Sequence, residues 1–92
     1  MDLEPLTPAL EGSLRSENGS STCVEFVNTR NDAVNIYWLD WAGGRVFYRR
    51  LMSGDRYIQQ TYVTHPWVVC NVDDEPLRIF QPIDSPARAV IR

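Results

Sequence analysis

The chain has 92 residues, of which 43% are hydrophobic and 23% are charged, a composition that fits one globular domain and excludes a disordered chain. Its formal net charge of -3 disfavours nucleic acid and anionic membranes as partners, because an acidic protein gains little from contact with phosphates. No apolar run approaches the roughly 18 residues that span a bilayer, and the start lacks the basic and apolar regions of a secretory signal. We therefore expect a cytoplasmic or nuclear protein.

Residues 1–22 show little periodicity of hydrophobic residues. They contain two prolines, two glycines and the Ser/Asn-rich stretch "SENGSST", all of which favour turns and loops. The pattern predicts a mobile N-terminal leader at 1–22 and a folded domain at 23–92. Within the leader, only "PALEGSLRS" favours a helical turn.

The domain reads as a series of short strands. Branched and aromatic residues recur in short runs, and turn-forming clusters such as "TRND", "AGG", "MSGD" and "DDEP" separate the runs. No run keeps a helical period near 3.6 residues. The sequence predicts an all-β fold, an antiparallel sandwich of seven strands, at residues 23–28, 33–41, 45–51, 56–63, 66–72, 77–81 and 87–92.

The inventory of reactive side chains argues against an enzyme. Cys23 and Cys70 are too few for a disulfide scaffold, and with His65 as the only histidine no zinc site can be assembled. His65 is also the only candidate base for a catalytic triad, and no nucleophile-elbow or glycine-rich phosphate loop is present. We expect no catalytic residues, no metal and no cofactor, and we expect both thiols to be buried.

Aromatic residues crowd into the middle of the chain. A thin sandwich needs at least half of them for its core. The remainder, placed around a hydroxyl and an imidazole, would form a pocket for an apolar ring that bears one polar group, such as hydroxylated proline. The residues concerned are Trp38, Trp41, Phe47, Tyr48, Tyr57, Tyr62 and Trp67.

Residues 24–67 resemble the β domain of the von Hippel-Lindau tumour suppressor family, whose members are substrate-recognition subunits of cullin-RING ubiquitin ligases. The resemblance runs without a gap through "VEFVN", "YWLD", Gly43, Tyr48, Leu51, "SGD", "TY" and "HPW". Its most specific part is the spacing of five positions: Trp38, Tyr48, Thr61, His65 and Trp67.

The resemblance implies that these five residues bind 4-hydroxyproline in an extended peptide of the hypoxia-inducible factor α type, which adds as a strand. Trp38 would form the floor of the pocket and Trp67 a wall, and the Tyr48 hydroxyl would bond the hydroxyproline carbonyl. Thr61, at a position where the family usually has serine, and His65 would hold the 4-hydroxyl group.

Two features of the sequence differ from the animal members of the family. Those members continue into a helical α domain that docks elongin C and the cullin, whereas this sequence stops at Arg92, so we do not expect that docking. Pro66 follows His65 and restricts the histidine to extended backbone.

Two other classes of function remain open at this stage. The aromatic residues could serve only the core of an interaction or structural domain, without recognising hydroxyproline. Exposed indole and phenol faces could also stack on sugars, although few amides and carboxylates lie near the five positions.

Overall fold

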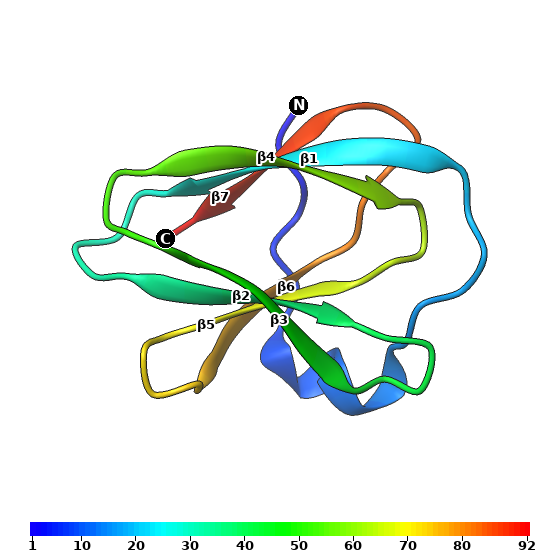
Figure 1. Ribbon diagram of the computed structural model, residues 1–92, viewed down its shortest axis with the longest axis horizontal. Coiled ribbons are helices and arrows are strands. Elements are labelled where there is room, and N and C mark those ends of the chain that lie inside the picture. The colour runs from blue at the N-terminus through cyan, green and yellow to red at the C-terminus, as the bar shows by residue number, and fades with distance from the viewer.

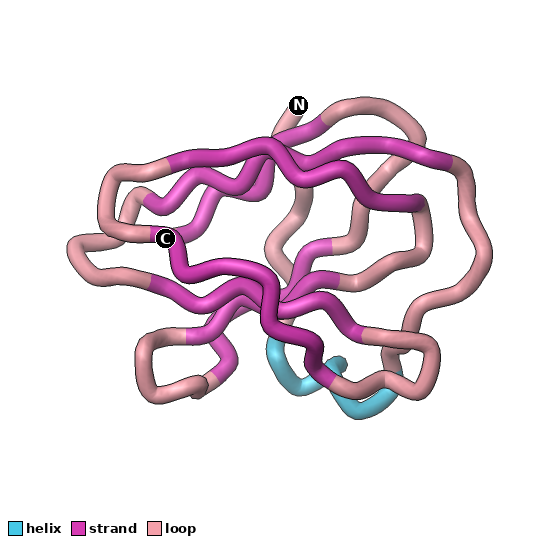
Figure 2. The backbone as a smooth tube through the Cα atoms, in the orientation of Figure 1, coloured by secondary structure: helices cyan, strands magenta, loops and turns pink.

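The computed structural model describes all of residues 1–92 and confirms the all-β prediction. It contains one short 3-10 helix and seven strands, arranged as two layers of strands with the helix below the lower layer (Figures 1 and 2). The elements are η1 (Pro8–Ser13), β1 (Ser21–Asn28), β2 (Val34–Leu39), β3 (Arg45–Leu51), β4 (Arg56–Tyr62), β5 (Trp67–Cys70), β6 (Pro76–Phe80) and β7 (Ala87–Ile91).

The two sheets differ in size and in strand direction. The small sheet has the order β4-β1-β7, and the large sheet has the order β3-β2-β5-β6. All neighbouring strands are antiparallel except β1 and β7. The predicted sandwich therefore contains one parallel pair, which the alternation of residues did not reveal.

The main core fills the space between the sheets. It takes Val24 and Phe26 from β1, Ile36 from β2, Trp67 from β5 and residues of β6 and β7. A second, smaller cluster lies on the opposite face of the large sheet, where Leu6 and Leu14 of the N-terminal segment cover β5 and β6. Because β5 is covered on both faces, all four of its residues are buried, as expected of a central strand.

The N-terminal segment differs from the predicted leader. Leu3 is buried in the main core, and Ser16 is also buried. The strand that was expected from residue 23 begins at Ser21, and η1 forms within the stretch that favoured a helical turn. The prolines and glycines of this segment hid the packing, because they favour loops and gave no sign that the leucines between them pack against the sheets.

The N-terminal segment also covers one edge of each sheet. Leu3 N donates to Arg88 O of β7 at 2.7 Å, and Leu6 exchanges two backbone hydrogen bonds with Ile79 of β6 at 2.8 and 3.1 Å. Figure 1 shows this blue segment crossing from the small sheet to the large one. Two edge strands, β3 and β4, keep no neighbouring strand on one side.

Both cysteines have free thiols, in agreement with the prediction that they form no bridge. Cys70 is buried as predicted, whereas Cys23 is only half-buried, so the prediction of burial was wrong for Cys23. Burial raises the pKa of the Cys70 thiol to about 11, so the thiol stays protonated and packs as a small apolar group. No helix in the structure has the length and apolar character to span a membrane.

Candidate peptide-binding site

The five predicted site residues lie around one cavity of about 240 Å³ between the two open edge strands. They come from four strands and from the turn between β4 and β5. The remaining lining residues are Trp41, Gln59, Gln60 and Tyr62.

The base of the cavity, called the inner half here, consists of Thr61, His65 and Trp67. Their exposed fractions are 3%, 8% and 1%. Trp67 Nε1 donates a hydrogen bond to Thr61 Oγ1 at 3.0 Å, which fixes both side chains. Trp67 belongs to the main core, so it lines the base of the cavity from below, whereas the resemblance implied that it forms a wall.

The hydroxyl of Thr61 keeps its own proton free. Thr61 Oγ1 accepts from Trp67 Nε1, and a hydroxyl has one further lone pair and one O–H donor to offer. Thr61 faces the cavity because β4 alternates, with Tyr57, Gln59 and Thr61 more buried than their neighbours. A polar ligand group at the base would therefore meet a hydroxyl donor.

His65 is enclosed by aromatic rings. Its imidazole lies 5.6 Å from Trp38 in a stacked arrangement, 5.1 Å from Trp41 and 5.0 Å from Tyr62, measured between ring centroids. Burial lowers the pKa of His65, and the nearby backbone of Glu17 opposes this shift. The neutral imidazole that burial favours carries one nitrogen able to accept a hydrogen bond.

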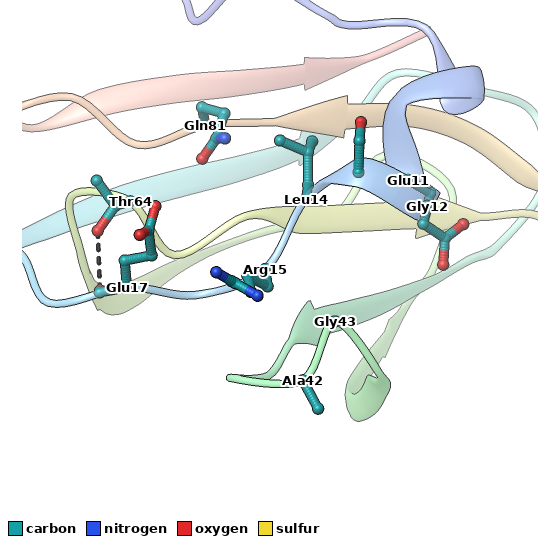
Figure 3. Close-up of a pocket in the computed structure, with 10 residues that line it drawn as sticks. Glu11, Gly12, Leu14, Arg15, Glu17, Ala42, Gly43, Thr64 and Gln81 are labelled. Carbon is teal, nitrogen blue, oxygen red and sulfur yellow. Dashed lines mark hydrogen bonds between the residues drawn. The ribbon is translucent and has the colours of Figure 1, made fainter.

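Contacts between residues 17–19 of the N-terminal segment and Val63 and Thr64, called the clamp from here on, hold the turn that carries His65. Thr64 has φ of 72°, which is uncommon for a β-branched residue. Its hydroxyl donates to Glu17 O at 2.8 Å (dashed line in Figure 3), and Glu17 N donates to Thr64 O at 3.2 Å. Gly19 lies so close that an added Cβ would stand 1.8 Å from Val63 O. The N-terminal segment thus positions the imidazole.

Pro66 extends this turn into β5. It is buried, and its carbonyl accepts from Leu39 N at 3.0 Å. No peptide bond in the chain is cis. The missing N–H of Pro66 leaves no ladder bond broken, because β5 begins only at Trp67.

The rim of the cavity, called the outer half, consists of Trp41, Tyr48 and Tyr62, all of which are exposed. Tyr48 lies edge-on to Trp67 with centroids 4.8 Å apart, and 6.4 Å from Trp38. Trp38 is half-buried and packs against the main core, so it combines the core role and the site role that its sequence position allowed.

A β-bulge directs Tyr48 into the cavity. In the pairing of β2 with β3, Ile36 faces Arg49 and Tyr37 faces Phe47, so the register skips Tyr48. An extra residue of this kind bends the strand and changes the direction of its side chain. Tyr48 and Arg49 therefore both lie on the inner side of β3, where they contact Trp67 and Tyr57.

Sequence reasoning did not assign four of the lining residues to the site. Gln59 shares its parity on β4 with Thr61, and this spacing of two could have identified it. Trp41 and Tyr62 were recognised as aromatic, but their positions in or beside turns gave no sign that both rings contact His65. Gln60 lies on the other parity, and no signal in the sequence points to it.

A second hollow, of about 540 Å³, lies beside the clamp (Figure 3). Its lining is mostly polar and includes Glu11, Arg15, Glu17, Thr64 and Gln81. None of the five predicted residues lines it. Its walls are the N-terminal segment and the turns before β3 and β5. The hollow therefore lies between the N-terminal segment and the sandwich.

The structure is a β-sandwich with an aromatic cavity at the open edge of its two sheets, and it contains no group of three or more His, Cys, Asp or Glu residues that could hold a metal. Comparison with known protein families matches residues 13–82 to the VHL beta domain, and no curated protein matches the chain. The chain belongs to the VHL beta domain family, which confirms the predicted resemblance. It is a substrate-recognition domain of the von Hippel-Lindau type.

Proposed function

We propose that this domain binds an extended peptide containing 4-hydroxyproline, with Trp38, Tyr48, Thr61, His65 and Trp67 as the binding residues. The observation that carries the proposal is the cavity itself, which gathers all five side chains and places a buried hydroxyl and a buried imidazole beneath exposed aromatic rings.

The hydrogen-bonding capacity of the base favours a ligand hydroxyl. Thr61 retains an O–H donor after accepting from Trp67, and a neutral His65 offers a nitrogen acceptor. A 4-hydroxyl group can accept from the first and donate to the second. An unmodified proline would leave both groups buried without partners, which costs about 1 to 3 kcal/mol for each.

The open edge of β4 supports binding by strand addition. Val63 N donates to Ser20 O, and Asn28 N to Asp55 O, so the odd-numbered residues of β4 make the bonds to β1. By the alternation of an antiparallel pair, the backbone groups of Ile58 and Gln60 face away from β1. An extended peptide can pair with them and place one ring in the cavity.

Titration calorimetry with two peptides that differ only in proline hydroxylation tests this proposal. We expect the hydroxylated peptide to bind more tightly by a factor of about 30 to on the order of 10,000, because the two unpartnered groups together cost about 2 to 6 kcal/mol. Equal affinity would contradict the proposal and would leave an interaction domain whose aromatic residues serve the core.

Two variants separate the parts of the site. His65→Ala should weaken binding of the hydroxylated peptide alone, because only that peptide uses the imidazole. Tyr48→Phe should weaken both peptides by a similar factor, because both present the same backbone carbonyl to the phenol.

In the animal members of the family, a further α domain docks elongin C and, through it, the cullin. We propose that peptide recognition by the present β domain does not depend on that assembly, since all five binding residues lie between positions 38 and 67. Hypoxia-inducible factor α-like peptides are the first candidates for titration.

A further inference from the structure

Arginines concentrate beside the open edge of β4 and the cavity, which together are called the proposed peptide groove. Four of the nine basic residues of this acidic chain fall within residues 45–56, together with a single acidic residue, Asp55. This segment comprises β3 and the turn into β4, the two strands that flank the cavity. Three of these four arginines have polar partners within the chain: Arg45 pairs with Glu11, Arg56 lies 3.9 Å from Glu25, and Arg50 Nε donates to Asn35 Oδ1.

Arg49 is the arginine of this segment whose guanidinium contacts β4, the other strand beside the cavity. Its guanidinium lies 4.2 Å from the centroid of the Tyr57 ring, in the gap between the two edge strands. It follows Tyr48 directly and shares the inner face with buried Ile36, its partner across the ladder. The bulge that directs Tyr48 into the cavity therefore also brings Arg49 to the inner side.

The charge of Arg49 has no counter-ion within the chain. The four ion pairs of the structure use Arg30, Arg45, Arg56 and Arg88, and Arg49 takes part in none of them. The flat face of the Arg49 guanidinium stacks on the Tyr57 ring. Its N–H groups make no hydrogen bond within the chain. Such a group is suited to a carboxylate, because a guanidinium fork matches the two carboxylate oxygens.

We propose that the bound peptide carries an acidic residue about four positions from the hydroxyproline, and that Arg49 pairs with it; this inference rests on the proposed function. Tyr57, which Arg49 covers, lies four residues before Thr61 on β4. Four residues of extended chain span about 13 Å. A peptide that pairs along β4 with its hydroxyproline over Thr61 therefore brings its fourth neighbour to Arg49.

The competing explanation is that Arg49 only protects an edge. Inward-pointing charges on edge strands discourage pairing between molecules, and the contact with Tyr57 would stabilise the fold. In that case Arg49 would have no preference for a charge in the peptide.

The test uses hydroxyproline peptides of equal length, with glutamate four residues before the hydroxyproline, glutamate four residues after it, or glutamine at both places. Since strand direction decides which side meets Arg49, we expect one glutamate peptide to bind about two- to fivefold more tightly than the glutamine peptide. This gain should disappear in Arg49→Gln, fall without vanishing in Arg49→Lys, which keeps the charge but lacks the guanidinium fork, and shrink at about 1 M salt.

Arg78→Gln is the matched control, because Arg78 lies on β6, far in strand order from β3, and is also absent from every ion pair. It should leave the gain unchanged. A gain that survives in Arg49→Gln, or no gain for either glutamate peptide, overturns the inference.

The glutamine peptide separates this failure from failure of the proposed function. If the glutamine peptide binds more tightly than the same peptide with unmodified proline, hydroxyproline recognition is supported, even if neither glutamate peptide shows a gain. If the two bind equally, or if no peptide binds, both proposals are wrong.

Discussion

The inner and outer halves of the cavity differ in what holds them in place. The inner half is buried and joined to the core through Trp67, whereas Trp41, Tyr48 and Tyr62 of the outer half are 54%, 46% and 41% exposed. If the proposed binding is correct, binding and folding depend on the same side chains at the base and on different ones at the rim. Substitutions in the inner half should change stability, and those in the outer half should mainly change ligand affinity.

The largest expected effect is that of Trp67→Ala. Removal of a buried indole from the core costs roughly 3 to 5 kcal/mol, a large part of the stability of a small domain. Trp41→Ala, at an exposed indole of the outer half, should cost about 1 kcal/mol or less. Urea unfolding of both variants measures the contrast, and similar losses would show that the two halves are not distinct.

Gly19→Ala tests the clamp that supports the inner half from outside. Its Cβ would stand 1.8 Å from Val63 O, so the segment must move from the turn that carries His65, at a cost of roughly 1 to 3 kcal/mol. Gly12→Ala is the control, because nothing lies within 4 Å of its Cβ. Thermal unfolding should show a clear loss for the first variant and a change within about 0.5 kcal/mol for the second.

Thr61→Val tests the hydrogen bond inside the inner half. The change leaves Trp67 Nε1 buried without an acceptor, which should cost about 1 to 3 kcal/mol. Thr22 faces Thr61 across the ladder, and its buried hydroxyl has no partner. Thr22→Val should therefore leave the free energy of unfolding unchanged or raise it, and an equal loss in both variants would contradict the role of the bond.

The smallest effect concerns pH. Burial lowers the pKa of His65 below the usual 6.5 of a histidine side chain, so the unfolded chain binds more protons than the folded one between the two pKa values. The contribution of His65 is fully present above about pH 6.5 and is lost as the pH falls below it. Wild type should lose more stability than His65→Gln between pH 7.5 and 5.5 in urea unfolding, and parallel losses would contradict the assignment.

The sequence was sufficient for the seven strands and for five of the nine residues that line the cavity. Short runs of branched and aromatic residues between turn formers identified all seven strands, because each local preference agrees with the fold. The register of Trp38, Tyr48, Thr61, His65 and Trp67 identified residues that the structure gathers at one cavity.

Three features could not be predicted from the sequence, each for a physical reason. The bulge at Tyr48 has no glycine or proline to mark it, since Tyr48 lies between Phe47 and Arg49. The burial of Trp67 depends on the strands above it, because an indole suits both a core and a pocket. The packing of Leu3 and Leu6 depends on distant sheets, so no local period reports it.

The coverage of β6 and β7 by the N-terminal segment also bears on self-association. Open-ended stacking of sheets requires each molecule to offer free edges on two opposite sides. Here the free edges of both sheets lie on one side only, beside the cavity. If two copies paired through these edges, neither copy would keep a free edge for a third. Association would therefore stop at a dimer, and fibres would not form.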